Sequence, residues 1–336
     1  MVTDPGTATA LSWSTRNVLQ PDGKLVTAGV VYLDDGRTDL ILIRYNVDGS
    51  LDDTFGDGGM VIKDFMGLST YPQDLMALPG DELLVTGAMS ETTDEGEIVQ
   101  IWSYLARFDS GGELITSFGG GDGYVLWDYN GEPHGAQRAM LLPNNRILVL
   151  GYTESDLQEI SPVDCTLQQF DMDGNMDETF GDEGWVIIDS GQGWDYCWDM
   201  KLTGDGKLVL AGESHEVEDP ELRGASSRIP RVGSAGARGG SDGTSRAANA
   251  PQAGTFDNII GRFYLDGTPD ASFGEDGLVR FRVNEDPALI YGVDIQPNGR
   301  YVVAGEAILG DFSQMVALRF LGDGPAARVI LPVVMR

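Results

Sequence analysis

Apolar runs of strand length alternate with polar, turn-forming clusters along the whole chain. Two such runs are "ELLVTGAM" (82–89) and "IWSYLARF" (101–108), and the clusters between runs are rich in Gly, Asp, Asn and Pro. Short runs bounded by turn residues are typical of β-strands, and no long stretch has the period of an amphipathic helix. The pattern therefore predicts an all-β protein. No stretch is long and apolar enough to cross a membrane as a helix.

One phrase recurs along the chain and ends in a glycine each time. Successive glycines are separated by about sixty residues, except for a longer last interval. Self-similarity at such a period indicates a repeat architecture. The copies are "LQPDGKLVTAG" (19–29), "LPGDELLVTG" (78–87), "LLPNNRILVLG" (141–151), "LTGDGKLVLAG" (202–212) and "IQPNGRYVVAG" (295–305).

A second phrase follows the first in most repeats. "YNVDGSLDDTFGDGGMV" (45–61) returns almost unchanged as "FDMDGNMDETFGDEGWV" (170–186), with looser copies at 108–125 and 263–279. A group present in every repeat is better explained by the repeat than by a single site. We predict that its phenylalanine packs between sheets and that the following glycine permits positive φ or a close backbone approach. The phenylalanines are Phe55, Phe118, Phe180 and Phe273.

Four short strands fit into each repeat if the "GMV" segment is taken as the first strand of its unit. Asp-Gly and Asn-Gly pairs at Asp22, Asp205 and Asn298 predict tight type I′ hairpins. Five repeats of four antiparallel strands predict a five-bladed β-propeller that forms a single domain over residues 1–336. The first repeat lacks its own "GMV" strand, so we predict that "ARVILPVV" (327–334) completes the first blade and closes the ring by pairing the N- and C-terminal strands.

Residues 218–254 interrupt the strand pattern of the fourth repeat. The segment is rich in Gly, Ala, Ser and Arg and has too few apolar residues to form a core. It is predicted to be a flexible insertion within the fourth blade. Two interpretations stay open, namely a tolerated surface loop and an arginine-bearing segment that lies against an acidic face.

The two recurring phrases resemble the bacterial delta-60 repeat family. The elements QPDGK, RYN-DG-LD and TFG-GG recur in order over nearly the whole chain outside 218–254. The second repeat is degenerate, and the fifth lacks the FG element. The resemblance implies a β-propeller in a secreted or surface-associated protein. It supplies no catalytic motif to carry over.

The charge excludes some partners. The chain has 53 acidic residues, 22 Lys and Arg, and a formal net charge of −31. Such a surface repels nucleic acid and anionic membranes and favours cations.

The start of the chain shows no signal peptide, and the setting is expected to be extracellular, cell-surface or periplasmic. Cys165 and Cys197 leave a single disulfide open, although two buried thiols are favoured.

The loops after the "GMV" strands vary most between repeats and are predicted to form a ligand-binding face. Three of them carry an acid at the same register, and a fourth has Arg282 there. Aromatic residues gather in the same loops, and aromatic faces beside carboxylates suit a sugar or a cation. The alternative is that Trp127 and Trp198 pack between blades. The predicted face comprises Asp64, Trp127, Asp128, Tyr129, His134, Asp189, Trp194, Tyr196 and Trp198.

A calcium site is predicted in the third repeat. Asp171, Asp173, Asn175 and Asp177 stand at alternate positions, as at the start of an oxygen-ligand loop. The position where such a loop needs a glutamate holds the shorter Asp182. Turn formation by Asp and Asn explains the same letters, so both interpretations stay open.

These observations predict a non-enzymatic, extracytoplasmic binding or structural module with a protein or glycan partner. No Ser-His-Asp order or zinc-binding pattern is visible, and no catalytic residue is assigned. One alternative is a glycan-directed hydrolase or lyase that uses carboxylates of the same face. Another is a subunit of a surface assembly.

Overall fold

The structure is a computed structural model that describes residues 13–93, 96–154, 163–190, 194–215, 256–283, 288–309 and 312–320. The predicted insertion 218–254 and the predicted closing strand 327–334 lie outside these residues. The described chain forms two compact units, which are treated separately below. Unit 1 holds residues 13–154 and 169–177, and unit 2 holds residues 163–168, 178–215 and 256–320 within the described ranges.

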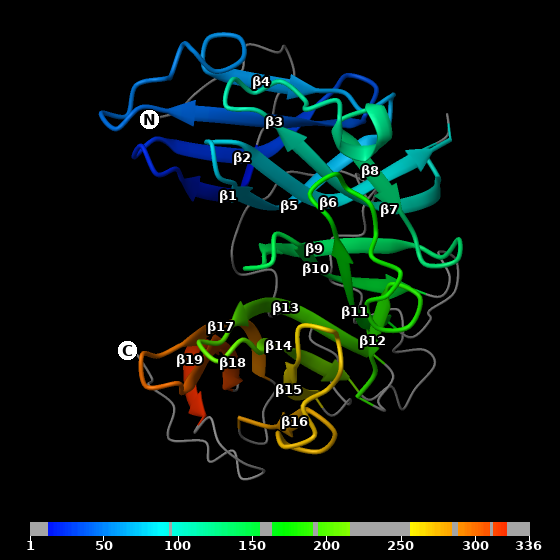
Figure 1. Ribbon diagram of the computed structural model, residues 1–336, viewed down its shortest axis with the longest axis vertical. Coiled ribbons are helices and arrows are strands. Elements are labelled where there is room, and N and C mark those ends of the chain that lie inside the picture. Colours follow the sequence, from blue (N-terminus) through cyan, green and yellow to red (C-terminus); the bar gives the residue numbers. More distant parts are fainter. Residues whose placement is uncertain are drawn as a thin grey trace. The chain divides into compact units, whose positions relative to one another are not determined.

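Unit 1 contains two antiparallel four-stranded sheets and a hairpin, each in chain order (Figure 1). The first sheet is β1 (Trp13–Leu19), β2 (Leu25–Tyr32), β3 (Thr38–Tyr45) and β4 (Met60–Lys63). The second is β5 (Ser69–Ala77), β6 (Leu83–Thr92), β7 (Ile98–Phe108) and β8 (Tyr124–Trp127), with the 3₁₀ turn η1 (Phe118–Gly121) before β8. The hairpin is β9 (His134–Leu141) and β10 (Ile147–Glu154).

Unit 2 repeats the same meander. β11 (Val163–Phe170), whose last two residues belong to unit 1, pairs with β12 (Trp185–Ile188). β13 (Trp194–Leu202), β14 (Leu208–His215), β15 (Phe256–Phe263) and β16 (Leu278–Phe281) pair in order. β17 (Ala288–Ile295), β18 (Tyr301–Leu309) and β19 (Phe312–Phe320) form the last described sheet. The start of β11 also meets the start of β13 in parallel, at Val163 and Trp194.

The all-β prediction is confirmed, but the strands are grouped differently from the prediction. Each "GMV" strand is the last strand of the preceding sheet and not the first strand of the next repeat. β4 pairs with β3, β8 with β7 and β16 with β15. The first sheet therefore has four strands among the described residues, and the predicted closure by 327–334 stays a prediction. A short apolar strand can pair on either side, and the sequence pattern does not show on which.

Burial explains why the middle strands are almost continuously apolar. β3 and β6 are buried along nearly their whole length, whereas the outer strand β4 is only partly buried. A strand with packed layers on both faces needs apolar residues at successive positions. Each unit has its own core. The unit 1 core includes Leu40, Phe55, Phe65 and Tyr104, and the unit 2 core includes Ile260, Phe273, Ile290 and Leu318.

The glycine that closes each first phrase faces a β-bulge. The register shifts once in β5, β13 and β17, beside the positions opposite Gly87, Gly212 and Gly305. A Cβ on these glycines would stand 2.0, 1.9 and 1.8 Å from a backbone oxygen of the bulged strand. No side chain fits at that distance. The recurring glycine is therefore fixed by close backbone approach.

The hairpin turns differ from the predicted type. At the first turn Gly23 has φ +85°, whereas Asp22 is not among the positive-φ residues. The N–H of Gly23 donates to the Gln20 carbonyl, and the N–H of Gln20 donates to the Lys24 carbonyl. This is a turn followed by one left-handed residue, rather than a type I′ turn that needs two.

The second phrase connects consecutive repeats. In unit 1 the N–H of Gly56 donates to the Gly111 carbonyl at 2.8 Å, and that of Gly119 donates to the Asp173 carbonyl at 2.9 Å. Gly56 has φ +53°, and a Cβ there would stand 2.1 Å from the Met60 oxygen. The predicted phenylalanine anchors Phe55, Phe118, Phe180 and Phe273 are all at most 4% exposed.

Buried ion pairs stand beside these connectors. In the first sheet Asp52 accepts Arg44 Nε at 2.7 Å and lies 3.0 Å from Lys24 Nζ. Unit 2 repeats this triplet with Asp270, which lies 2.7 Å from both Arg262 Nε and Lys207 Nζ. The repeated acids therefore have cationic partners from the same sheet.

The second repeat keeps the arginine but takes its acid partner from a different position. Ile115 stands where the first repeat has Asp52, and Glu82 stands where it has Lys24. Arg107, equivalent to Arg44, lies 2.7 Å from Glu82. The arginine thus retains a carboxylate partner although the acid comes from another strand.

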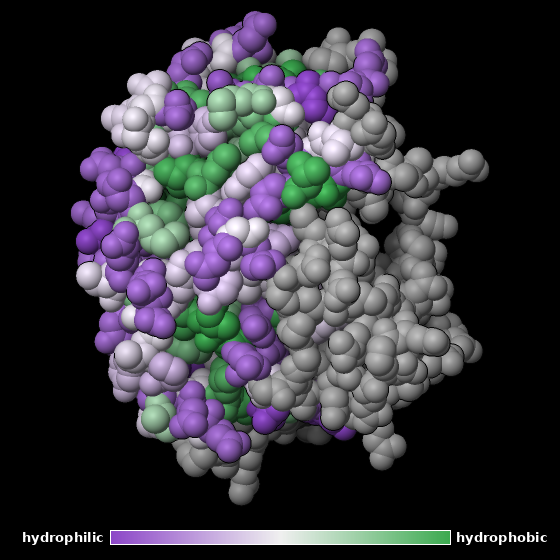
Figure 2. All heavy atoms as spheres, turned by 90° about the vertical axis from the view of Figure 1, so that its right-hand side faces the viewer, coloured by the Kyte–Doolittle hydropathy of each residue, from purple (hydrophilic) through white to green (hydrophobic). Residues whose placement is uncertain are grey.

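Exposed apolar residues are scattered over several strands and loops. Figure 2 shows one face, on which hydrophobic side chains form separate small groups among hydrophilic ones. The most exposed large apolar residues are Leu19, Val47, Met66 and Met315, at 62% to 78%. Single residues of this kind are ordinary at a protein surface. In the described part of the chain, no helix has the length and apolar character needed to cross a bilayer.

Candidate active site

Three carboxylates from different parts of unit 2 converge at one place. Asp164 lies on β11, Asp189 directly follows β12, and Asp195 lies on β13, with one oxygen of each within 4.8 Å of the others. The β11–β12 register, in which Cys165 faces Ile188, places Asp164 opposite Asp189. The parallel contact at Val163 brings β13 to the same place. Asp189 is exposed, Asp164 is partly buried and Asp195 is fully buried.

The environment of Asp164 favours its protonated form. Burial, followed by the charges of Asp189 and Asp195, raises the pKa of Asp164 to about 6. The charged groups that act on Asp164 in the described chain are both acids. A carboxyl group with this pKa exchanges its proton close to neutral pH, as a general acid or base must.

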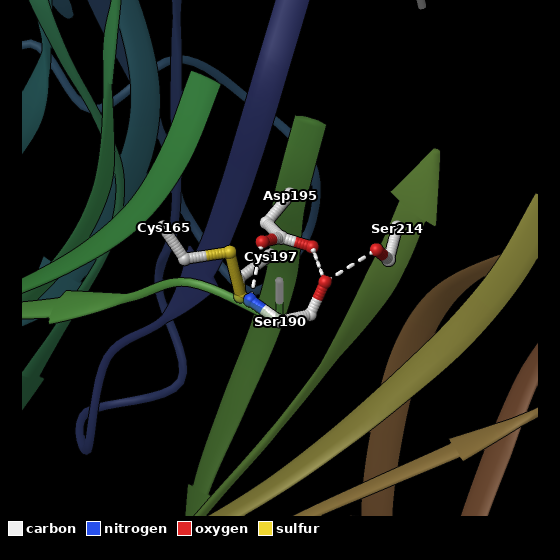
Figure 3. Close-up of a disulfide and its surroundings, with 5 residues drawn as sticks. All are labelled: Cys165, Ser190, Asp195, Cys197 and Ser214. Carbon is white, nitrogen blue, oxygen red and sulfur yellow. Dashed lines mark hydrogen bonds between the residues drawn. A yellow bond between two sulfur atoms is a disulfide. The ribbon is translucent and has the colours of Figure 1, made fainter. Parts of the chain in front are cut away.

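Asp195 is held by a serine network (Figure 3). The N–H of Ser190 donates to Asp195 Oδ2, and the Ser190 hydroxyl donates to Oδ1, both at 2.6 Å. Ser190 Oγ also lies 2.5 Å from Ser214 Oγ. Burial raises the pKa of Asp195, while the hydrogen bonds from Ser190 and Ser214 oppose the rise. The network fixes the orientation of this carboxylate.

A disulfide ties together the two strands that carry Asp164 and Asp195. Cys165 on β11 and Cys197 on β13 are bonded, with their Cα atoms 5.6 Å apart, and both are buried. The favoured prediction of two free thiols is therefore wrong. The parallel contact that brings these strands together is not visible in the sequence, where the cysteines are 32 residues apart.

This arrangement supports proton-transfer or nucleophilic chemistry by paired carboxylates. Paired carboxyl groups about 5 Å apart are the geometry of retaining glycosidases, whereas inverting enzymes keep theirs farther apart. Carboxylate oxygens are also the ligands that Ca²⁺ takes, so the same cluster offers donors for a divalent cation. Among the described residues it is the group of acids whose oxygens converge closely enough for that.

Of the predicted face, only Asp189 belongs to the cluster. Trp127, His134, Trp194 and Tyr196 are 0% to 8% exposed, so their rings are not available as surface stacking platforms. Trp127 packs against Phe170 with ring centroids 4.7 Å apart, as its packing alternative proposed. In unit 2 Trp194 and Tyr196 form an edge-to-face pair.

His134 is a core residue of unit 1. Its Nδ1 lies 2.5 Å from the Ser103 hydroxyl, and burial lowers its pKa to about 3, so the ring is neutral. Trp198 is partly buried. It stacks on Tyr196 at 6.0 Å and meets Tyr291 edge to face.

The remaining predicted residues in unit 1 belong to turns. Asp64 accepts the N–H of Gly67 at 2.6 Å, and Asp128 accepts that of Gly131 at 2.9 Å. Tyr129 is partly buried. Asp64 and Asp128 do occupy the register of Asp189, but within the described residues neither has oxygens of two further acids within 4.8 Å.

The predicted calcium ligands of unit 1 make turn hydrogen bonds. Asp171 Oδ1 accepts the N–H groups of Asp173 and Asn175, and Oδ2 accepts the Asn175 side chain. Asp177 lies 3.6 Å from Arg146. A cation would have to displace these partners, and calcium at this loop stays a prediction.

Sequence reasoning found Asp189 and missed Asp164 and Asp195. The signal that could have found Asp164 is the register between paired strands. Asp164 stands at the start of the third strand of its sheet, β11, and there it faces Asp189, the loop acid after the fourth strand, β12. No such signal leads to Asp195, which reaches the cluster through the parallel contact of β11 and β13.

The comparisons with known proteins support the fold and assign no activity. Residues 20–55 match a family model described as "Domain of unknown function (DUF5122) beta-propeller", which supports a β-propeller family. No curated protein matches the chain. Among solved structures, a mannose phosphorylase from Leishmania mexicana aligns with a TM-score of 0.42 and 12% identity, over 98% of this chain and 90% of that one.

Two further structures align over similar shares. A levansucrase variant from B. megaterium has a TM-score of 0.44 and 10% identity, over 97% of this chain and 85% of that one. The polysaccharide lyase Uly1 has a TM-score of 0.40 and 10% identity, over 93% and 75%. The prediction of a non-enzymatic module finds no support in these comparisons, because the printed names of the three neighbours are those of a phosphorylase, a levansucrase and a polysaccharide lyase. At such low similarity no activity is carried over, and a function has to rest on the site itself.

Proposed function

We propose that this protein is a glycan-acting hydrolase or lyase that uses the carboxylates of Asp164, Asp189 and Asp195. The observation that carries the proposal is the convergence of the three acids within 4.8 Å, with the pKa of one raised to about 6. Keeping like charges together costs stability, and proteins retain such arrangements mainly at functional sites.

Each acid has a distinct role in the proposed reaction. Asp164, whose pKa is raised to about 6, donates a proton to the leaving glycosidic oxygen from the fraction that is protonated near neutral pH. Asp189, the exposed member, faces the substrate as the ionised nucleophile or base. Asp195, held by Ser190, is a positioning residue whose charge helps keep the proton on Asp164.

The test is a panel of polysaccharides incubated with the wild-type chain and with Asp164→Asn. New reducing ends detect hydrolysis, and absorbance of an unsaturated sugar detects elimination by a lyase. The proposal expects turnover of at least one glycan by the wild type and its loss in the variant. Equal activity of both proteins, or no turnover of any glycan in the panel, overturns it.

We also propose that the chain is a delta-60 repeat propeller with five blades in an extracytoplasmic setting. The recurring phrases and the bulge glycines support the repeat assignment. The buried disulfide supports an oxidising compartment, because such bonds are rare in the cytosol. Small-angle scattering and the redox state of Cys165 and Cys197 in the native compartment test these two statements.

A further inference from the structure

The last described sheet of unit 2 differs from the others in its connector charges. Arg300 precedes β18 and Arg319 lies near the end of β19, and both are partly buried. Tyr301 pairs with Phe320, and Val302 pairs with Arg319. In the first sheet Leu25 pairs with Tyr45, and Val26 pairs with Arg44. Arg300 and Arg319 therefore occupy the register of Lys24 and Arg44.

The same register in sheet β13–β16 also holds two cations around one acid. Leu208 pairs with Phe263, and Val209 pairs with Arg262, so Lys207 and Arg262 are the equivalent cations. They share Asp270, which stands eight residues after its arginine. Asp52 stands at the same interval after Arg44. In both of these sheets, two cations at this register thus hold one carboxylate.

The fifth repeat has the two cations without that acid. The residue at the corresponding interval after Arg319 is Ala327, which lies outside the described residues. Nε of Arg319 is buried and has no hydrogen-bond partner among the described residues, whereas Nε of Arg44 and of Arg262 each donates to its aspartate at 2.7 Å. A buried guanidinium N–H without a partner is costly, and a carboxylate is the group that relieves it.

We propose that Arg300 and Arg319 bind the carboxylate of a uronic acid unit in the glycan. The inference rests on the proposed function for the identity of the ligand and on the register of the two arginines for the site. A guanidinium donates two parallel N–H hydrogen bonds to a carboxylate, which suits a planar acid on a sugar ring.

The test measures binding by calorimetry with the full-length Asp164→Asn chain, which leaves the ligand intact. The ligands are trigalacturonate and its fully methyl-esterified form, which differ only in the charge of the carboxyl groups. We expect the acid form to bind and the ester to bind at least roughly ten times more weakly. Arg319→Gln and Arg300→Gln should each weaken binding of the acid roughly 10- to 100-fold.

Arg280→Gln is the matched control, because Arg280 is an exposed arginine of β16 without an ion pair in the described part of the chain. It should bind like its parent, and Arg319→Lys should fall between the parent and Arg319→Gln. Equal binding of acid and ester, or unchanged binding by both Gln variants, overturns the site. Self-association that is lost in Arg319→Gln also overturns it, because the carboxylate then comes from another copy.

The outcomes separate this inference from the proposed function. Arginine-dependent binding of trigalacturonate, with no turnover of any glycan by the wild type, supports the binding site and defeats the enzyme. Turnover that depends on Asp164, with equal binding of acid and ester, defeats the binding site and leaves the enzyme.

Discussion

The same cross-strand position carries an acid pair in both units, but in the described chain only the pair of unit 2 has a third acid with an oxygen within 4.8 Å of both. In unit 1 Asp39 on β3 faces Asp64, by the register in which Leu40 faces Lys63. Burial, Asp64 and Asp35 raise the pKa of Asp39, but Arg37, whose Nη1 lies 3.9 Å from Asp64, opposes this rise. In unit 2 Asp164 faces Asp189, and the further charge that acts on Asp164 is that of Asp195.

Other repeats treat this position in yet other ways. In sheet β13–β16 Asp257 faces Arg282, and the two form an ion pair. In sheet β5–β8 the loop acid is Asp128, and it accepts a hydrogen bond from Gln100. The scaffold thus supplies a loop position that is usually compensated by a cation or a neutral partner. The comparison indicates that accumulation of acid at Asp164 is a property of one site and not of the repeat.

The largest expected effect is a difference in catalytic activity between variants of the two acid pairs, Asp164–Asp189 and Asp39–Asp64. Asp164→Asn should lower kcat on the glycan substrate roughly 10²- to 10⁴-fold, because the proton donor is lost. Asp39→Asn should leave kcat within about twofold, because Asp39 is the equivalent acid in a pair without a catalytic role. Steady-state kinetics of both variants check this, and an equal loss in both would erase the distinction.

The connector acids should show the opposite behaviour, since they stabilise the fold. Asp270→Ala leaves Arg262 and Lys207 without their shared carboxylate, and the free energy of unfolding should fall by about 3 kcal/mol. Denaturant unfolding measures it.

Glu82→Ala is the comparison for Asp270→Ala, because the pair of Glu82 with Arg107 is more exposed and should contribute at most about 1 kcal/mol to the free energy of unfolding.

The cations around Asp270 hold its pKa below the usual value, so the stabilisation by Asp270 is present above the unfolded-state pKa and is lost as the pH falls below about 4. Similar losses of unfolding free energy in Asp270→Ala and Glu82→Ala would show that burial of the triplet adds nothing to stability.

Removing the charge of Asp164 should stabilise the protein. Its folded-state pKa of about 6 lies above the unfolded value, so ionisation opposes folding and stability falls as the pH rises from about 4 to about 6. With allowance for its partial exposure, Asp164→Asn should raise the free energy of unfolding by about 1–2 kcal/mol at pH 8. The gain should vanish near pH 4. A loss of stability at pH 8 would show that Asp164 is structural.

The smallest expected effect concerns calcium at 171–177. Asp171 and Asp177 already have N–H and guanidinium partners, so calcium should raise the unfolding midpoint by no more than about two degrees through this loop. Thermal unfolding with EDTA, calcium or magnesium checks it, with Asp173→Asn as the loop variant. A calcium-specific rise of many degrees that Asp173→Asn abolishes would show that these acids are metal ligands.

Local, repeated features were predictable from the sequence. Phe55 and Gly56 recur as a unit, and their burial and positive φ follow from what phenylalanine and glycine do in any connector. The shared register of Asp64, Asp128 and Asp189 was also visible, because these residues follow similar strands at similar distances.

Features that depend on pairing between distant strands were not predictable. The place of the "GMV" strand in its sheet depends on which neighbour it pairs with, and both neighbours are apolar. The disulfide and the approach of Asp195 to Asp164 depend on the parallel contact of β11 with β13, which breaks the antiparallel pattern of the repeats. Buried aromatics such as Trp194 look the same in sequence as binding aromatics, and only the packing distinguishes them.

The central claim is that Asp164 titrates near pH 6, because burial and two neighbouring acids disfavour its charged form. A carboxyl ¹³C NMR titration of the full chain, with Asp164→Asn to assign the resonance, measures this without a substrate. The account predicts a midpoint near 6 for Asp164, which falls toward the ordinary range in Asp195→Asn. A midpoint near 4 in the wild-type chain would contradict it.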